Sequence, residues 1–559
     1  MANQPKTVVV LGGGVGGLSA AHELAERGFQ VRVFERKSRF GGKARSLEVP
    51  NTGSGGRRDL PGEHGFRFFP NFYKHVTDTM KRIPYPGNPQ GVFDNIVPGT
   101  RAQIARNGKM SIVAVARCPQ TLDDWVDTLK AVVDSASLGI PDNEVLFYVD
   151  RLLTLLTTCE ARRVAEYEKI PWWDFIDAEH KSSAYQQFLA RGMTRSMVAI
   201  RAEEGSTRTV GYIGLQLTLG LLKIGDPVDR LLNGPTNEVW IDPWIKYLGS
   251  LGVEVHNQAK LVSFQMDACG ISSVTVEMNG SLQTVTGDYY VAALPAEAMA
   301  PLATADMKRA APSIANIDKL RTSWMNGLQF YLEHDVPVVN GHTIYIDSPW
   351  ALTSVSQRQF WRSDQLMKYG DGRVNGILSV DISDWNSQGI LYGKPAVQCT
   401  AEEIKEEVWA QIKAHLNVDG RQQLEDGNLL AWFLDPDIEF PNPSQVTNLE
   451  PLLINTAGSL AYRPEAHTEI PNLFLASDYV HTYSDLACME GANEAARRAT
   501  NAILDRAGSS AHRATLWPLE EPDFFKPMRD YDWLRFRLGL PHASLPTPLH
   551  LRSAMAAVS

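Results

Sequence analysis

The residues best suited to chemistry at the start of the chain are three glycines and one acid. Gly12, Gly14 and Gly17 follow a β-branched run at residues 7–11, and Glu35 comes about twenty residues later. In this pattern Gly12 permits a tight turn, Gly14 lets the backbone approach a pyrophosphate, and Gly17 allows a helix to pack closely on a strand. An acid at Glu35 would bond ribose hydroxyls, which favours an unphosphorylated ribose, as in FAD or NAD, over NADP.

Two strands and a helix must position these residues. We predict strands at residues 7–11 and 30–34, with a helix between them that begins near Val15 and Gly16. The free N–H groups and positive end of that helix would face the phosphates. A secretory signal peptide is the alternative for this segment, but five glycines and the charged residues that follow argue against it.

A basic, glycine-containing loop comes next. Gly41 and Gly42 would let the backbone approach a cofactor, and Arg36 and Lys43 add positive charge beside the ribose site. Arg39 or Lys43 would meet phosphate charge. A solvated turn is the alternative if this loop is considered alone.

A second set of small and acidic residues lies near the other end of the chain. Asp478 ends a short apolar run predicted to be a strand, and could bond a ribityl hydroxyl. Residues 485–499 are predicted to enter a helix, with Met489, Gly491 and Ala492 in its first turn. Another helix N-terminus with small residues can therefore approach a cofactor.

Together these segments resemble the superfamily of flavin amine oxidases and phytoene desaturases. The resemblance implies an α/β fold, α+β overall, with a Rossmann-type FAD-binding domain of the glutathione-reductase type and a discontinuous substrate domain of sheet and helix. It implies FAD as cofactor, with contacts from Gly12, Gly14, Gly17, Glu35, Gly42, Asp478, Met489 and Gly491. Leu261 and Val262 resemble a strand whose backbone contacts adenine.

The residues directly before Met489 distinguish two branches of this superfamily. Amine oxidases generally place there an aromatic ring, which sandwiches the amine over the flavin with a second ring. Leu486, Ala487 and Cys488 carry no ring. We therefore favour the carotenoid- and squalene-type desaturase branch, with amine oxidation as the alternative.

A histidine within the aromatic segment at residues 62–70 is the catalytic candidate. His64 is the candidate because histidine is the side chain best suited to proton transfer near neutral pH, and a structural histidine is an equal alternative. The segment resembles the part of carotenoid-type desaturases that passes the isoalloxazine ring. Its charged residues, Glu63 among them, would orient His64 or bind the flavin pyrimidine. The cofactor residues assigned here are Gly65, Phe66 and Arg67.

The expected chemistry follows from the flavin. An apolar substrate carbon held near flavin N5 can lose a hydride to it, and a neighbouring carbon then loses a proton. Desaturation, isomerisation or dehydroxylation of an isoprenoid is the leading hypothesis. The alternatives are an amine or amino-acid oxidase and a flavin-free carrier of prenylated proteins.

Composition limits the class of protein. The chain has 559 residues, a net charge of −10 and five cysteines without a CxxC motif. The charge argues against nucleic acid as a partner, and the cysteines favour a reducing, cytoplasmic compartment without a metal site. No window has the apolar length of a spanning helix. We expect a small apolar or amphipathic substrate, with peripheral membrane contact left open.

The order of motifs predicts a discontinuous layout. The FAD domain is expected at residues 1–75, 235–300 and 455–508, and the substrate domain at 76–234 and 301–454. Periodicity at 152–156 and 212–222 predicts helices in the first insertion, and alternation at 327–332 predicts a strand in the second. The extension at 509–559 is expected to pack on its own domain rather than on a membrane surface or a partner subunit.

Overall fold

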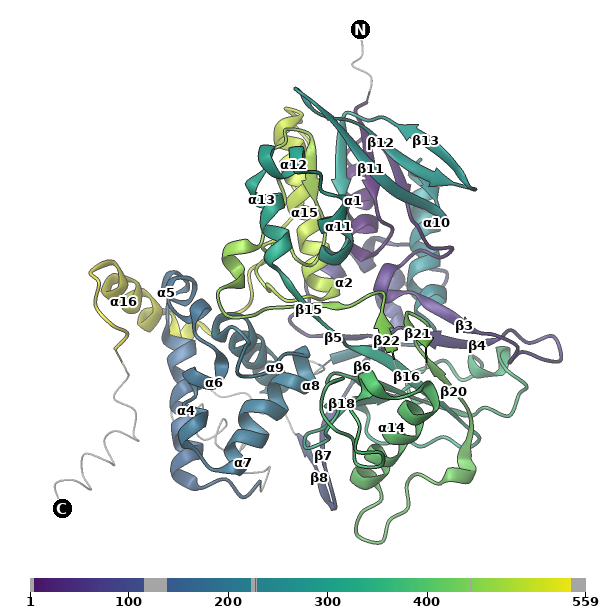
Figure 1. Cartoon of the computed structure of the whole chain (residues 1–559), viewed down its shortest axis with the longest axis vertical. Coiled ribbons are helices and arrows are strands. Elements are labelled where there is room, and N and C mark those ends of the chain that lie inside the picture. The colour runs from purple at the N-terminus through teal and green to yellow at the C-terminus, as the bar shows by residue number, and fades with distance from the viewer. Residues whose placement is uncertain (1–4, 115–137, 223–226, 228, 443–444, 544–559) are drawn as a thin grey trace.

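The chain is described here by a computed structural model that covers residues 5–114, 138–222, 227, 229–442 and 445–543. Figure 1 shows three regions: a sheet with helices that carries the N-terminus, a helical region beside the C-terminal helix, and a second sheet covered by one long helix. Cys118 lies outside the described residues, and the other four cysteines are free.

The first region is built on a five-stranded parallel sheet. Its strands, in spatial order, are β10 (Glu254–His256), β2 (Gln30–Phe34), β1 (Thr7–Leu11), β14 (Tyr289–Ala292) and β24 (Leu473–Leu475). Val8, Val9 and Val10 of β1 are fully buried, as expected for a parallel strand covered on both faces. The strands predicted at 7–11 and 30–34 are confirmed.

Helices from both ends of the chain pack against this sheet. The helix predicted near Val15 is α1 (Val15–Ala25), and it packs beside α15 (Met489–Arg506), so that prediction is also confirmed. The other elements here are α2 (His75–Arg82), α10 (Asp242–Ser250), α11 (Ala296–Leu302), α12 (Ala305–Ala310), α13 (Pro312–Ala315), and an antiparallel sheet of β11 (Ala259–Asp267), β12 (Gly270–Met278) and β13 (Ser281–Val285).

The core of this region extends past the predicted boundaries at residues 75 and 300. Met80 of α2, Met307 of α12 and Ile314 of α13 are fully buried in the same apolar cluster as the parallel strands. These helices therefore belong to the first region, because they cover apolar surface that its sheet would otherwise leave exposed.

The second sheet in Figure 1, which is covered by one long helix, is a seven-stranded mixed sheet. Its spatial order is β20 (Leu429–Leu434), β16 (Asn326–Leu332), β19 (Gly376–Ile382), β18 (Leu352–Ser356), β17 (Gly341–Tyr345), β7 (Arg101–Arg106) and β8 (Lys109–Ala114). The strand predicted at 327–332 is confirmed as β16, but every residue in it is buried rather than every second one. Both faces are covered, since Leu328 packs toward α14 (Ala401–Leu416) and Tyr331 packs with Phe66 in another cluster.

The first insertion contributes strands as well as helices. Its strands β7 and β8 join the sheet above. Short strands complete the connections: β3 (Ser46–Val49) with β4 (Leu60–Glu63), β5 (Phe68–Pro70) with β9 (Asp229–Leu232) and β6 (Ile96–Gly99), β15 (Arg321–Ser323) with β23 (Leu452–Ile454), and β21 (Ile438–Asn442) with β22 (Gln445–Asn448).

The helical region confirms the helices predicted from periodicity. Its helices are α4 (Asp142–Thr157), α5 (Glu160–Ala165), α6 (Trp172–Phe175), α7 (Ser183–Tyr185), α8 (Met193–Val198) and α9 (Tyr212–Leu222). Among the helices described, none is long and apolar enough to cross a membrane.

The C-terminal extension packs back on this helical region through α16 (Lys526–Arg537) (Figure 1). Arg162 Nε lies 3.0 Å from Asp532 Oδ1, and both side chains are buried. Asp532 also accepts the backbone N–H of Cys159 at 2.9 Å. Residues 544–559 of the extension lie outside the described residues.

Candidate active site

A cavity of about 550 Å³ joins the first region to the second sheet. Its wall combines the carboxyl ends of the parallel strands with residues 64–68 and one residue of β19. A volume of this size lies within the range of about 300–1,000 Å³ typical of ligand sites. The cavity brings together most of the residues predicted for the cofactor: Gly12, Gly14, Val15, Gly16, Glu35, Arg36, Gly41, Gly42, Lys43, Gly65, Phe66, Arg67, Asp478, Met489 and Ala492.

Glu35 sits at the end of β2 with both carboxylate oxygens engaged by the backbone. Its Oε2 accepts the N–H of Gly13 at 2.7 Å, and its Oε1 accepts the N–H of Lys37 at 2.8 Å. Burial raises the pKa of Glu35, while these two N–H groups oppose that shift. The remaining lone pairs of a carboxylate held in this way can accept ribose hydroxyls.

The glycines of the first turn have two different roles. A Cβ added to Gly12 would lie 2.4 Å from the carbonyl oxygen of Ala293, and Gly12 has a φ of +109°. A Cβ on Gly17 would lie 1.9 Å from the carbonyl oxygen of Gly12. Gly14 instead lines the cavity, and its nearest neighbour would be Gly42 Cα at 3.5 Å. Gly14 therefore leaves space for a ligand, whereas Gly12 and Gly17 leave space for backbone.

The second glycine loop lies directly against the first. Gly41 has a φ of +116° and donates its N–H to the carbonyl of Gly13 at 2.8 Å. Arg39 does not line the cavity and pairs with the exposed Glu48 at 2.6 Å, whereas two other basic side chains of this loop pair with acids in the cavity wall or beside it. Arg36 reaches Glu450 at 3.0 Å, and Lys43 reaches Glu297 at 2.9 Å.

The second helix N-terminus faces the same cavity. Cys488, Met489 and Ala492 at the start of α15 line it, as does Asp478 beyond β24. Gly491 does not line the cavity, because its N–H points to Cys488 Sγ at 3.4 Å. A Cβ there would lie 2.7 Å from the carbonyl oxygen of Leu486, so Gly491 serves the close packing of this turn.

The segment expected to contact adenine reaches the cavity through the residues just before Val262. Val262 is 39% exposed and lies outside the cavity wall, to which Ala259, Lys260 and Leu261 contribute instead. The pairing of β11 with β12 shifts register between Leu261 and Ser263. This bulge leaves Val262 unpaired and exposed, and a bulge cannot be read from the alternation of the sequence.

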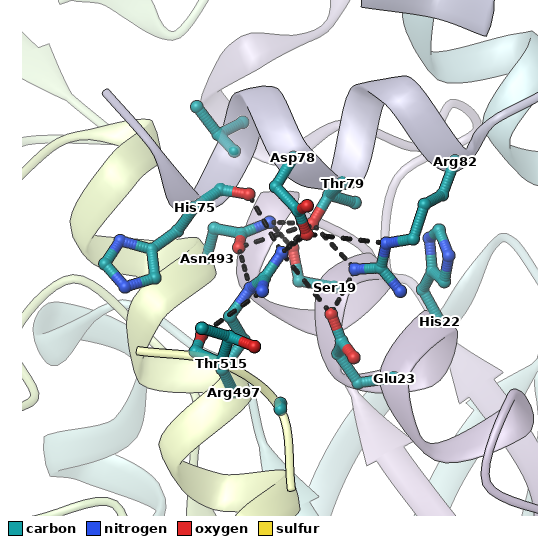
Figure 2. A network of polar contacts seen from close by, with 12 residues as sticks. Ser19, His22, Glu23, His75, Asp78, Thr79, Arg82, Asn493, Arg497 and Thr515 are labelled. Atoms are coloured by element: carbon teal, nitrogen blue, oxygen red, sulfur yellow. Dashed lines mark hydrogen bonds and ion pairs between the residues drawn. The ribbon is translucent and has the colours of Figure 1, made fainter. Parts of the chain in front are cut away.

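A buried polar network fixes α1, α2 and α15 relative to one another (Figure 2). Asn493 of α15 donates to Ser19 of α1 at 2.7 Å and to Thr79 of α2 at 3.0 Å. Arg497 pairs with Asp78 at 2.6 Å. The network also includes Glu23, Arg82 and Thr515. The two helix N-termini at the cavity are therefore held in one arrangement, although they lie more than 450 residues apart.

Glu490 ties the second helix to the start of α2. It accepts the backbone N–H groups of Lys74 at 2.8 Å, His75 at 2.9 Å and Val76 at 3.0 Å. It also lies 2.7 Å from His75 Nδ1. An acid at a helix N-terminus satisfies free N–H groups there. Glu490 thus orders the chain just after Tyr73, another residue of the cavity wall.

The far end of the cavity is mostly apolar. Leu486, Ala487 and Cys488 all line the wall, and none of them carries an aromatic ring. The apolar residues of the wall include Phe66, Phe68, Tyr73, Met325, Leu452, Leu453 and Leu486, whereas Leu294 lies beside Gly12.

His64 lines this end and is held by a partner far along the chain. Its Nδ1 lies 2.5 Å from Oδ2 of the buried Asp435, which also accepts from Asn326 at 2.8 Å. Glu63 is not the orienting group that we expected. Its carboxylate instead bonds Ser46 at 2.8 Å and Thr236 at 2.9 Å.

Arg67 and Asp381 are two further charged groups of this wall. Arg67 donates to the carbonyls of Gly65 at 2.7 Å and Phe66 at 3.2 Å, and burial lowers the pKa of Arg67. Asp381 on β19 lines the cavity and was missed from sequence. Neither Asp381 nor Asp435 belongs to a motif, so no local signal could have identified them.

Comparison with known proteins places the chain in a family. The model of the family "flavin containing amine oxidoreductase" matches residues 15–504. A 15-cis-phytoene desaturase of Synechococcus elongatus is 23% identical over 536 residues, covering 92% of this chain and 98% of the relative. A probable zeta-carotene desaturase of the same organism is 22% identical over 533 residues, covering 89% and 98%.

Solved structures share the fold at low identity. Cyclohexylamine oxidase from Brevibacterium oxydans aligns with a TM-score of 0.58 at 12% identity, covering 90% of this chain and 100% of that chain. A putative protoporphyrinogen oxidase from Exiguobacterium gives 0.57 at 14% identity, covering 90% and 99%. With the matched residues spanning both helix N-termini of the cavity, this chain belongs to the flavin containing amine oxidoreductase family and is an FAD-dependent oxidoreductase.

Proposed function

We propose that the protein oxidises C–H bonds of a largely apolar substrate such as an isoprenoid. The observation that carries this proposal is the apolar end of the cavity, with no aromatic ring at residues 486–488. The near full-length relatives named as carotenoid desaturases support the same reaction class. Isomerisation or removal of an allylic hydroxyl at the same site would be redox-neutral forms of this chemistry.

We assign the nucleotide end to the ADP half of FAD in a Rossmann-type arrangement. Glu35 would hold the ribose, the turn at Gly14 and Gly42 the pyrophosphate, and Asp478 the ribityl chain. The donor set fits an anionic dinucleotide, because two helix N-termini and glycine backbone meet in one cavity. When bound, FAD supplies a hydride acceptor at N5.

The protein's own contribution at the other end is to bind and orient the substrate. Phe66, Phe68 and Leu453 would remove apolar substrate surface from water, at roughly 25 cal/mol per Å² buried. Arg67 would face the polar rim of the flavin ring. A substrate carbon fixed in this wall reacts more readily because its position is set before the reaction.

The partner of this site is, in our proposal, a small apolar or amphipathic molecule rather than a nucleic acid. The net charge of −10 opposes binding to a phosphate backbone. Delivery of such a substrate from a membrane surface is compatible with exposed aromatic residues on α16, such as Tyr531 and Trp533.

Anaerobic reduction of the purified, FAD-loaded protein tests the proposal. We expect 15-cis-phytoene or squalene in detergent micelles to bleach the flavin absorbance, and cyclohexylamine or benzylamine to leave it unchanged. Bleaching by the amines alone would establish the second candidate, an amine oxidase, which the shared fold of cyclohexylamine oxidase favours. A protein that stays colourless with added FAD would favour the flavin-free carrier.

A further inference from the structure

We propose that Asp381 is the residue that exchanges a proton with the substrate at the apolar end of the cavity. It lies near the end of β19, directly opposite Gly327 of β16 on one side and Thr353 of β18 on the other. Its side chain is buried and belongs to the cavity wall. This inference rests on the proposed function, because it assigns the proton that leaves when a C–H bond is oxidised.

Two glycines, which have no side chain, allow the loop at residues 64–66 to lie close against this part of the sheet. A Cβ on Gly327 would lie 2.7 Å from Gly65 Cα, and a Cβ on Gly65 would lie 2.9 Å from Asp381 Oδ1. The N–H of Gly327 donates to the carbonyl of His64 at 2.6 Å. The N–H of Phe66 opposes the rise in the pKa of Asp381. Asp381 therefore lies on a strand of the sheet directly against the loop at residues 64–66.

The Asp381 carboxyl group is only partly satisfied. Its Oδ1 is buried and has no hydrogen-bond partner among the described residues. A buried polar atom without a partner costs about 1–3 kcal/mol and calls for an explanation. A group that arrives with the substrate, or a proton on the carboxyl itself, would explain it.

The surroundings of Asp381 allow both protonation states near neutral pH. Burial raises the pKa of Asp381 to about 7, against the opposing effects of Arg67, His64 and the N–H of Phe66. Asp435 is the acid that faces it and adds to the rise. A proton acceptor works best when its pKa is close to the working pH.

His64, our candidate from sequence, then becomes a positioning residue. Its Nδ1 lies 2.5 Å from Asp435 Oδ2, and Asp435 accepts a hydrogen bond from Asn326. In the proposed step one substrate carbon gives up a hydride, which the flavin would accept, and the Asp381 carboxylate takes the proton from the neighbouring carbon. The electron pair of that C–H bond forms the C=C bond, and the neutral Asp381 later releases the proton to water.

Asp229 of β9 provides a matched control. It is also buried, its Oδ1 also lacks a partner among the described residues, and burial raises the pKa of Asp229 to about 7. It does not line the cavity. Asp229→Asn therefore changes the same chemical group at a site where it cannot meet FAD or substrate.

The test measures the midpoint potential of bound FAD against pH, without any organic substrate. Reduction adds negative charge near Asp381, so the wild type should take up one more proton per FAD than Asp381→Asn just above pH 7. Asp229→Asn should behave like the wild type, and Asp381→Glu should keep the additional proton at a shifted pH. Infrared spectra of oxidised and reduced protein should show a protonated carboxyl band that only Asp381→Asn lacks.

Equal proton uptake by the wild type and Asp381→Asn would overturn the inference, as would equal losses in Asp381→Asn and Asp229→Asn. If Asp381→Asn does not retain FAD, the infrared carboxyl band is compared in the wild type and in Asp381→Glu. A band that responds to reduction in both proteins would support the inference, and a band that responds in neither would overturn it. The substrate proposal can fail by the bleaching assay while this result stands, so the two failures are distinguishable.

Discussion

The two ends of the cavity are built in different ways. At the nucleotide end, close backbone contacts dominate, and both oxygens of Glu35 accept backbone N–H groups. At the substrate end, side chains from separate strands meet, and Asp381 Oδ1 and Arg67 Nε have no hydrogen-bond partner among the described residues. The first end is therefore fixed mainly by backbone contacts, whereas the second leaves buried polar atoms unpaired among the described residues.

The largest expected effect comes from breaking the backbone packing at the nucleotide end. Gly17→Val should lower the free energy of unfolding by about 4 kcal/mol or prevent folding, because its Cβ would lie 1.9 Å from the Gly12 carbonyl oxygen. Urea unfolding of the flavin-free protein measures this. Gly249→Ala in α10 is the control, since nothing lies within 4 Å of its Cβ. Wild-type stability in Gly17→Val would show that α1 can move away from the sheet.

Gly14→Leu should separate cofactor binding from folding at the same turn. Gly14 has φ −79° and ψ −175°, which leucine adopts easily, and its Cβ would enter the cavity. We expect FAD affinity to fall at least about 100-fold, or roughly 2.7 kcal/mol, with stability of the flavin-free protein changed by less than about 1 kcal/mol. Flavin fluorescence titration provides the affinity. Full FAD retention would remove Gly14 from the site.

Glu35→Gln should have a smaller effect, because the amide keeps the shape but loses the charge and one acceptor. We expect FAD affinity to fall roughly 10-fold, about 1.4 kcal/mol, in the same titration. Glu254→Gln on the neighbouring strand β10, where the side chain is exposed, should leave the affinity unchanged. Equal affinities for all three proteins would contradict a ribose contact at Glu35.

Buried acids away from the nucleotide end should give stability a pH dependence. Burial raises the pKa of Asp229 to about 7, so the folded state holds a proton that the unfolded chain releases near its ordinary value of 3.8. The free energy of unfolding should therefore fall as pH rises from about 4 to 7. Asp229→Asn should be more stable than the wild type by up to about 4 kcal/mol at pH 7.5 and nearly equal at pH 4. Parallel pH profiles in urea would contradict the shift.

The nucleotide end could be predicted closely because its signals are local. A β-branched strand, a glycine turn and an acid at a strand end are contiguous in sequence, and they form β1, α1 and β2 where expected. Residues expected at the cavity lie outside its wall where their position depends on register or on a neighbouring turn. Val262 lies at a bulge, and Gly491 packs on Leu486 rather than facing the cavity.

The substrate end could be predicted only in character. The aromatic segment around His64 and the absence of an aromatic ring at residues 486–488 were visible in the sequence. Residues of both segments line the cavity. The partner of His64 was not visible, because Asp435 comes from a loop more than 350 residues later. A strand was predicted only in the second insertion, but β7 and β8 of the first insertion pair into the same sheet.

The sequence by itself predicted a dinucleotide-binding turn at the start of the chain and, by resemblance, a flavin shared with the far end, because each of these motifs is a short backbone conformation encoded by neighbouring residues. Only the tertiary structure decided which side chains meet at the reacting end. Asp381, His64 and Asp435 become neighbours through the pairing of β16 with β19 and the packing of residues 64–66 on that sheet. Such contacts between distant segments depend on how the sheets pair and pack, which no local pattern specifies.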